Sequence, residues 1–369
     1  MTTIISAPTT VTVGVSGNQT LASLAASMAP GTWAELTSAS SQNAVLGVGP
    51  TSGSTIHYCN SMPWNSRNKT IEIVAMDHAA GMQRYMRYDD ASNAFVLVMA
   101  DDGAGAATRH GYDHNAVNPY TGDVYHRVGE YGYEGPGLLV RKFAFGGSSF
   151  TNMARVTTLF YMQIAIGATW WSGAFAGAGA QGCLLLYNSG DSQIGGSAAD
   201  GGMYAYDPLA DSWFWKSLGM SPYYGAAGYS YNSVLEYSAT HNCAVYGGGG
   251  DGPRKLWRLN ANRSVTPMPD APASTTVGIQ SGNFVADPVT GNFLLLSAGE
   301  LWELNPTGSG TWTKQTGARV PPARVGVPGG PGVTFIEGVI SSAIPEYGIV
   351  AYIKQTGVNY GTFFVYKHA

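Results

Sequence analysis

The sequence predicts an all-β protein in which a unit of four short strands is repeated about six times around a ring. The clearest copy of the unit runs from Ser281 to Gln315, where turn residues such as Asn, Pro and Gly separate four strand-like segments. The copies follow one another at a spacing of roughly 45–60 residues, which is typical of radially arranged four-stranded sheets. The last copy ends at Tyr366 without its fourth strand, and a strand of the missing kind, Thr32–Leu36, lies near the other end of the chain. These observations predict a six-bladed β-propeller that is closed by strands from both termini.

Strand-like segments mark the six units in turn, at residues 84–90, 138–143, 203–208, 255–260, 301–305 and 362–366. Several markers are followed by an aromatic-containing strand, at residues 93–98, 212–218 and 311–314. Hairpin pairs precede others, at residues 116–125 and 233–250, with turn formers between the two strands. The glycine run after Tyr246 predicts an inner strand, because blades crowd the axis and glycine lets their backbones approach.

Residues 1–31 differ from the rest of the chain, because they carry no aromatic and no charged side chain. Residues 9–15 alternate like a strand, with Thr9, Val11, Val13 and Val15 on one face. Residues 21–28 predict one or two helical turns. We therefore divide the chain into an N-terminal anchoring arm, residues 1–31, and a propeller, residues 32–369.

The arm is expected to bind other protein chains of a larger assembly. An ordered strand needs partners for its backbone groups. Because a closed ring is expected to leave no free sheet edge nearby, these partners should come from another chain. On this interpretation, removal of residues 1–28 leaves the stability of the propeller nearly unchanged. Removal of residues 1–40 destabilises the whole propeller, because it deletes the closing strand.

The composition argues against several classes of function. The net charge is −4 and charged residues make up only 11% of the chain, with no cluster of Lys and Arg, which disfavours nucleic acid as a partner. No apolar run is long enough to span a bilayer, so membrane insertion is not expected, and the N-terminus does not resemble a signal peptide. The three cysteines, Cys59, Cys183 and Cys243, are too far apart in sequence to suggest a disulfide framework or a zinc site.

A known repeat can be identified in the middle of the chain. Residues 204–213, together with the glycine run at 246–250, resemble the kelch repeat, in which a glycine pair ends one strand and a Tyr and a Trp flank a turn. The chain from residue 32 to residue 369 is thus similar to the kelch-type β-propellers of the galactose-oxidase-like superfamily. The resemblance implies a fold closed by terminal strands, and no single activity. Some relatives are copper-dependent oxidases, but their tyrosine–cysteine pair and paired histidines cannot be placed here, so no cofactor is expected.

One stretch of the sequence is rich in residues that move protons. Three of the seven histidines lie within residues 109–126, and the candidate catalytic group is His110, His114, Tyr125 and His126. A Tyr–His pair opposite an arginine suits proton abstraction from a uronic acid, as in propeller-type polysaccharide lyases. In the alternative interpretation, His110 and His114 stabilise a hairpin beside the axis, and the sequence predicts no metal site.

Aromatic pairs form a second candidate site. Trp170 and Trp171, with Tyr223 and Tyr224, are candidate platforms on which the CH faces of sugars pack. The alternative is that these rings fill the space between neighbouring blades.

The function predicted from the sequence is that of a non-enzymatic interaction or structural propeller, attached to a larger assembly by its arm. A virus or bacteriophage particle is the predicted location, with a role in decoration, in a fibre or in binding a host-surface glycan. The alternative is a carbohydrate-active enzyme, either a polysaccharide lyase or a hydrolase, or a lectin-like sugar binder, that uses the axial mouth of the ring.

Overall fold

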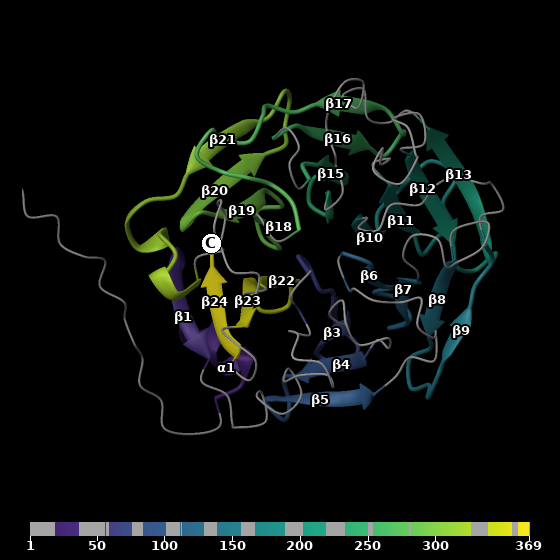
Figure 1. Cartoon of the computed structure of the whole chain (residues 1–369), viewed down its shortest axis with the longest axis horizontal. Helices are drawn as coiled ribbons and strands as arrows, with labels where there is room; N and C mark the ends of the chain where they lie inside the picture. Colours follow the sequence, from purple (N-terminus) through teal and green to yellow (C-terminus); the bar gives the residue numbers. More distant parts are fainter. Residues whose placement is uncertain are drawn as a thin grey trace, which may run out of the picture.

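Secondary structure in the computed structural model is almost entirely β-strand. The residues that it describes are 19–36, 56, 59–75, 84–100, 111, 113–128, 139–155, 167–188, 202–218, 233–249, 254–279, 282–325, 339–355 and 361–368. They form six sheets of four antiparallel strands each. The sheets stand radially around one axis as the blades of a propeller (Figure 1). The predicted fold class and the predicted number of blades are therefore confirmed.

In each blade the strands follow one another from the axis outward. The first blade contains β2 (Trp64–Asn65), β3 (Thr70–Ala75), β4 (Arg84–Asp89) and β5 (Ala94–Met99). The second contains β6 (Asn115–Val117), β7 (Val124–Val128), β8 (Leu139–Phe143) and β9 (Phe150–Asn152). The third contains β10 (Gly167–Trp171), β11 (Cys183–Asn188), β12 (Gly202–Asp207) and β13 (Ser212–Leu218).

The remaining blades follow the same order. The fourth contains β14 (Val234–Ser238), β15 (Cys243–Gly247), β16 (Leu256–Asn260) and β17 (Val265–Pro267). The fifth contains β18 (Asn283–Ala286), β19 (Phe293–Ser297), β20 (Glu300–Asn305) and β21 (Thr311–Lys314), and two short 3₁₀ helices follow it, η2 (Gly317–Arg319) and η3 (Ala323–Val325). The sixth contains β22 (Val339–Ile344), β23 (Ile349–Gln355), β24 (Gly361–Lys367) and, outermost, β1 (Thr32–Leu36). The six markers of the sequence analysis are thus the third strands of the blades.

The glycine run after Tyr246 ends a second strand, β15, rather than an inner one. The predicted reason for the glycines nevertheless holds. A Cβ added to Gly248 would lie 2.4 Å from the carbonyl oxygen of Val277, and Gly249 N donates to the same oxygen at 2.8 Å. The run therefore lets the fourth blade approach the segment that leads into the fifth.

The core consists of apolar layers between neighbouring blades. Aromatic rings bridge these layers, as in the pairs Tyr88–Phe363, with ring centroids 4.8 Å apart, and Tyr187–Tyr246, at 4.6 Å. Because each blade is covered on both faces, its strands carry continuous apolar runs; all five residues of β19 are buried, for example. Packing against both neighbours is what holds each blade in the ring.

The ring is closed by the pairing of β1 with β24. Trp33 lies opposite Tyr366, with ring centroids 4.7 Å apart, and Leu36 lies opposite Phe363. The predicted closure by strands from both termini is confirmed. In Figure 1 β1 and β24 lie side by side although they come from opposite ends of the sequence.

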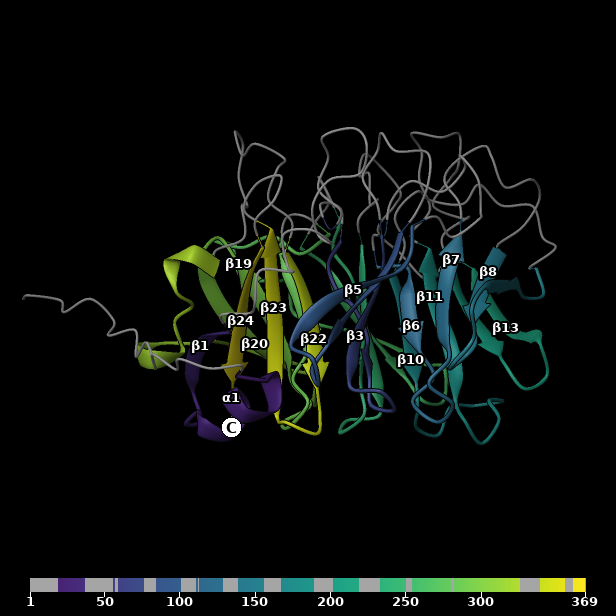
Figure 2. The same ribbon diagram turned by 90° about the horizontal axis from the view of Figure 1, so that it is seen from below.

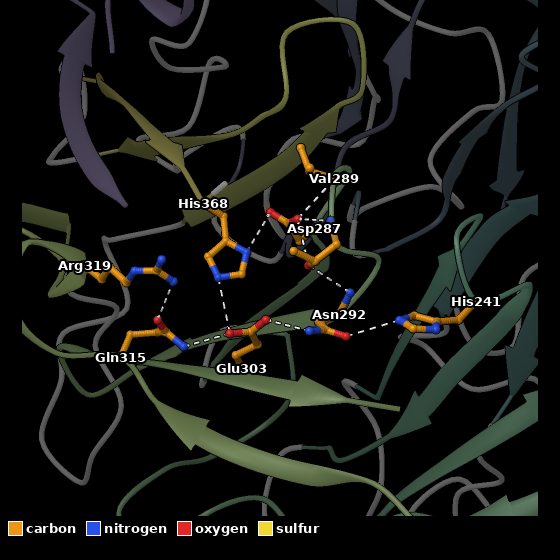
Figure 3. A network of polar contacts seen from close by, with 9 residues as sticks. His241, Asp287, Val289, Asn292, Glu303, Gln315, Arg319 and His368 are labelled. Carbon is orange, nitrogen blue, oxygen red and sulfur yellow. Dashed lines mark hydrogen bonds and ion pairs between the residues drawn. The ribbon is translucent and has the colours of Figure 1, made fainter. Parts of the chain in front are cut away.

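A buried ionic network secures the C-terminal end of the closing blade to the fifth blade (Figure 3). The His368 ring follows β24 and lies between two carboxylates, with Nδ1 3.6 Å from Asp287 Oδ2 and Nε2 3.2 Å from Glu303 Oε2. Glu303 also accepts hydrogen bonds from Asn292 Nδ2, at 2.7 Å, and Gln315 Nε2, at 2.8 Å. Burial of the ring alone lowers the pKa of His368, but the two carboxylates outweigh it and raise the pKa to about 9. His368 is therefore a buried cation at neutral pH.

The helix α1 (Leu21–Ser27) packs on the end of the ring beneath the closing blade (Figure 2). Leu21 and Leu24 are buried in one core cluster with Ile344 and Phe363. Lys367 Nζ donates to the carbonyl oxygen of Ala25 at 2.9 Å. The predicted helical turns are confirmed, but the described part of the segment 1–31 lies against the propeller core rather than outside it. The expectation that residues 1–28 are dispensable for stability is therefore revised.

Removal of residues 1–28 should lower the free energy of unfolding of the propeller more than removal of residues 1–18, because only the longer truncation deletes α1. Loss of the buried Leu21 and Leu24 side chains is expected to cost about 3–6 kcal/mol in total. Chemical unfolding of the chains 19–369 and 29–369 measures the difference. Leu24→Ala should cost about 2–5 kcal/mol, and Ala26→Ser on the exposed side of the helix is its matched control. Equal stability of the two truncated chains would contradict this assignment of α1.

His368 should make the stability of the propeller depend on alkaline pH. Its pKa is raised on folding, so its contribution is complete below the unfolded value of about 6.5 and is lost as pH rises through about 9. Relative to His368→Gln, the wild-type protein should lose roughly 3 kcal/mol of stability between about pH 6 and pH 10. Urea unfolding of both proteins across this range tests the prediction. A constant difference between them would show that folding does not raise the pKa of His368.

Candidate functional site

Asparagine and serine residues that precede β2 cross the axis and connect several blades. The Asn60 side-chain amide pairs with the backbone of Phe284, since Nδ2 donates to its carbonyl oxygen at 3.1 Å and Oδ1 accepts from its N–H at 3.0 Å. The Asn60 carbonyl oxygen accepts from Ser341 N at 2.8 Å. The amide thus replaces a neighbouring strand and joins the first blade to the fifth and sixth. We refer to Asn60 and Ser61 together as the polar plug.

Two carboxyl groups lie against the plug. Asp113 accepts hydrogen bonds from Ser61 N, at 2.8 Å, and Asn60 Nδ2, at 3.3 Å. Glu236, on β14, accepts a hydrogen bond from the Ser61 side chain. Burial raises the pKa of Asp113, and burial together with the neighbouring Asp113 raises the pKa of Glu236 well above its usual value. These shifts favour the protonated form of the Glu236 carboxyl group, which both donates and accepts a hydrogen bond.

A pocket of about 180 Å³ adjoins Glu236 along the axis. It is lined by residues of the innermost strand of every blade, β2, β6, β10, β14, β18 and β22, together with residues 61–63 before β2, Pro119 after β6 and Ser172 after β10. Its aromatic lining residues are Trp64, Trp170 and Tyr237, and its polar ones are Ser61, Asn115, Thr169, Ser172 and Glu236. The pocket is therefore a small cup with an aromatic and polar lining, in which Glu236 is the acidic group.

The aromatic walls are held by hydrogen bonds that the rings make with the protein. Trp64 Nε1 donates to Glu346 Oε2 at 2.8 Å, and Trp170 Nε1 donates to the Gln181 carbonyl oxygen at 3.0 Å. Tyr237 OH donates to Asn242 Oδ1 at 3.0 Å. Because their polar atoms are already paired, these side chains present apolar ring surface to the pocket.

The structure brings together only some of the candidate catalytic residues. His114 and His126 are buried, with ring centroids 6.1 Å apart, and His126 Nδ1 lies 3.2 Å from Asn115 Oδ1. Burial, with the nearby charge of Arg141 and Arg127, lowers the pKa of His126 to about 3, so its ring is neutral.

Tyr125 lies on the opposite face of β7 from His126, and its ring packs 5.3 Å from that of Trp170. His110 lies outside the described residues, and a catalytic role for the group stays a prediction.

Of the aromatic residues predicted to bind sugar, only one is found at the pocket. Trp170 lines the pocket, whereas Trp171 is fully buried, packs 4.7 Å from Phe175 and donates from Nε1 to Asn242 Oδ1 at 2.9 Å. Tyr223 and Tyr224 lie outside the described residues. Glu236 and Trp64 were not singled out in the sequence. The available signal for Glu236 was a carboxylate within an otherwise apolar strand, Val234–Ser238.

Across the described ranges, no group of three or more His, Cys, Asp and Glu side chains is close enough to hold a metal ion. The three cysteines are buried free thiols. Among the same residues, no helix has the length and apolar character needed to cross a membrane.

No protein-family model and no curated protein matches the chain. Among solved structures, it is similar to an α-L-arabinanase of Penicillium chrysogenum complexed with arabinobiose, with 11% identity, a TM-score of 0.53 and coverage of 90% of this chain and 98% of that one. The GH93 α-L-arabinofuranosidase of Fusarium graminearum with arabinobiose gives 11% identity, a TM-score of 0.54 and coverage of 87% and 97%. A structural genomics protein of unknown function from Bacteroides thetaiotaomicron gives 12% identity, a TM-score of 0.52 and coverage of 91% and 75%. At these identities the likeness shows the propeller fold alone.

Replacement of Glu236 by Gln should make the protein less sensitive to rising pH. A carboxyl group whose pKa is raised on folding stabilises the folded state least at high pH, because the unfolded chain gives up its proton first. Glu236→Gln keeps the shape and the acceptor oxygen but cannot ionise. The fall in melting temperature of the wild-type protein between about pH 5 and pH 9 should therefore be smaller in this variant. Glu300→Gln, at an exposed ion pair with Lys314, is the control that should not remove the fall.

Proposed function

We propose that the protein binds carbohydrate without cleaving it, and that it holds a single sugar unit in the axial pocket. The observation that carries this proposal is the cup itself, in which the neutral acid of Glu236 lies among the rings of Trp64, Trp170 and Tyr237. Sugars combine apolar CH surfaces with hydroxyl groups. The aromatic residues of the pocket suit the CH surfaces, and Glu236 and the neighbouring Ser61 hydroxyl suit the sugar hydroxyl groups.

The size of the pocket supports a small ligand. Its volume of about 180 Å³ lies below the range of about 300–1,000 Å³ that is usual for pockets enclosing drug-sized molecules. One sugar ring at the end of a chain is a ligand of this order, with the rest of the chain left outside. A protonated carboxyl group suits a hydroxyl partner because it donates and accepts at once, and no charge has to be desolvated.

Binding is better supported than hydrolysis. Glycoside hydrolysis uses two carboxyl groups that flank the scissile bond, one protonated and one ionised. Only Glu236 of the axial pair lines the pocket; Asp113 lies behind it, in contact with Asn60 and Ser61. Burial raises the pKa of both groups, which disfavours an ionised carboxylate beside a bound sugar.

Hydrolysis of an arabinose-containing chain is the second candidate. Two of the similar structures are an α-L-arabinanase and an α-L-arabinofuranosidase, each in complex with arabinobiose. Their likeness carries the fold only, so it supports the choice of ligands to test rather than a mechanism. Arabinobiose is therefore the first probe, followed by other short oligosaccharides.

Other predictions from the sequence stay predictions. The kelch-type assignment, the location in a virion and the attachment to other chains through residues 1–31 rest on sequence patterns and composition. A glycan-binding propeller is compatible with a host-surface role, and the sugar specificity measured below bears directly on it.

Titration calorimetry with arabinobiose and a panel of short oligosaccharides tests the proposal. At least one sugar is expected to bind, and Glu236→Ala should weaken its binding at least tenfold, because the loss of a paired hydrogen-bonding group leaves a sugar hydroxyl unsatisfied. Glu236→Gln should keep most of the affinity, since it preserves an uncharged donor and acceptor.

Matched controls and product analysis separate the outcomes. Trp170→Phe, which trims the wall, should weaken binding, and Trp257→Phe, at a buried ring remote from the pocket, should not. Equal affinity of Glu236→Ala and wild type would place the sugar elsewhere. Release of reducing sugar by the wild-type protein, abolished in Glu236→Gln, would favour the hydrolase.

A further inference from the structure

The outer edge of the first blade is unusually apolar. Strand β5 is the last strand of its sheet, so within the described residues no strand pairs with its outer edge. Its sequence, Ala-Phe-Val-Leu-Val-Met, has no polar side chain, and Val96 and Leu97 are 41% and 43% exposed. An uncovered apolar edge strand is a template for another strand.

The outer strands of the other blades carry features that block such pairing. Strand β13 contains Lys216, β21 contains Lys314 and β1 contains Glu35, and charged side chains disfavour the addition of a strand. Strand β17 ends in Pro267 and β9 is only three residues long. A bulge in the β4–β5 pair, between Tyr85 and Met86, is the one such feature that the first blade shows.

The N-terminal segment enters the fold beside this edge. Asp90, in the turn that precedes β5, accepts a hydrogen bond from Leu21 N at 2.5 Å and from Tyr347 OH at 2.7 Å. The first turn of α1 is therefore attached to the beginning of β5. The segment that precedes Gln19 is therefore connected to the fold next to the beginning of β5.

We propose that residues 9–15 pair with the outer edge of β5 in the same molecule, as a fifth, antiparallel strand of the first blade. Five residues lie between Val15 and Leu21, and the six residue steps of an extended chain reach up to about 20 Å. Strand β5 begins beside the attachment point and runs away from it, so a segment that leads back to α1 lies antiparallel to it. Reach and direction are thus both compatible with pairing.

The chemistry of the two strands also matches. Residues 9–15 consist of Thr, Val and one Gly and contain no charged side chain. Strand β5, whose edge they would cover, contains none either. Pairing gives the backbone groups of both strands partners and covers Val96 and Leu97. Attachment to the same chain gives the segment a high effective concentration at this edge, which favours its own β5 over that of another copy. The partner expected from the sequence was another chain, because no free edge was foreseen; β5 provides one.

Hydrogen–deuterium exchange of the full-length protein tests this pairing. The β5 amides that face outward should exchange about tenfold or more slowly in the wild-type protein than in Val13→Pro, because proline removes a donor from the middle of the added strand. Thr2→Pro, outside the segment, is the matched control and should exchange like the wild type. The protection should persist in about 1 M NaCl, since neither strand is charged.

Sedimentation velocity on the same three proteins distinguishes the possible occupants. The proposal requires that β5 be protected in a monomer. Protection that appears only in a dimer, lost together with dimerisation in Val13→Pro, would show exchange of the segment between copies and overturn the proposal. Equal exchange of β5 in wild type and Val13→Pro would show that residues 9–15 do not cover it. The chain 19–369, which contains every described residue, should exchange like Val13→Pro.

Discussion

The pairing of β1 with β24 is the interaction on which the rest of the structure depends. Every blade has apolar residues on both faces, so a blade is stable only when it has a neighbour on each side. An open row of six blades would leave two such faces in water. The pairing builds the sixth blade from both ends of the chain, and the buried His368 holds that blade to the fifth through Asp287 and Glu303.

The axis imposes the second constraint. Inner strands from six blades converge there, and polar side chains such as those of Asn60, Asp113 and Glu236 are buried among them. The Asn60 amide, which makes the hydrogen bonds of a strand neighbour, satisfies part of this demand. Asp113 and Glu236 satisfy the rest, since burial favours their uncharged forms. The same burial thus favours the protonated form of Glu236, which lines the pocket.

The sequence predicted the fold well because the repeat is local. Turn chemistry between short apolar strands identified the third strand of every blade, and the unpaired strand at each end indicated the closure. The site was harder to predict, because it depends on contacts between residues far apart in sequence. Asn60 is 224 residues from Phe284, and Glu236 belongs to a strand whose neighbours at the axis lie in other blades.

Local reasoning also misplaced two features. The helix of residues 21–27 was assigned to an arm outside the propeller, because nothing local shows that Leu21 and Leu24 face residues such as Phe363. Tyr125 and His126 are adjacent in sequence, but neighbouring residues of a strand point to opposite faces, and only one of them faces Asn115. Period-two alternation predicts this separation, provided that the strand is recognised first.

Closure of the ring by its two ends has a consequence for how the protein is made. Strand β1 pairs with β24, and the contact between Lys367 and Ala25 joins residues 342 positions apart, so β1 has no partner until β24 has been synthesised. Blades one to five are each contiguous in sequence and are able to assemble while synthesis proceeds, whereas the sixth is completed only once β24 has emerged. During that interval the nascent chain carries an unpaired Thr32–Leu36 strand and an open sheet. The final, non-local step is thus the slow one and the moment of greatest exposure to misassembly.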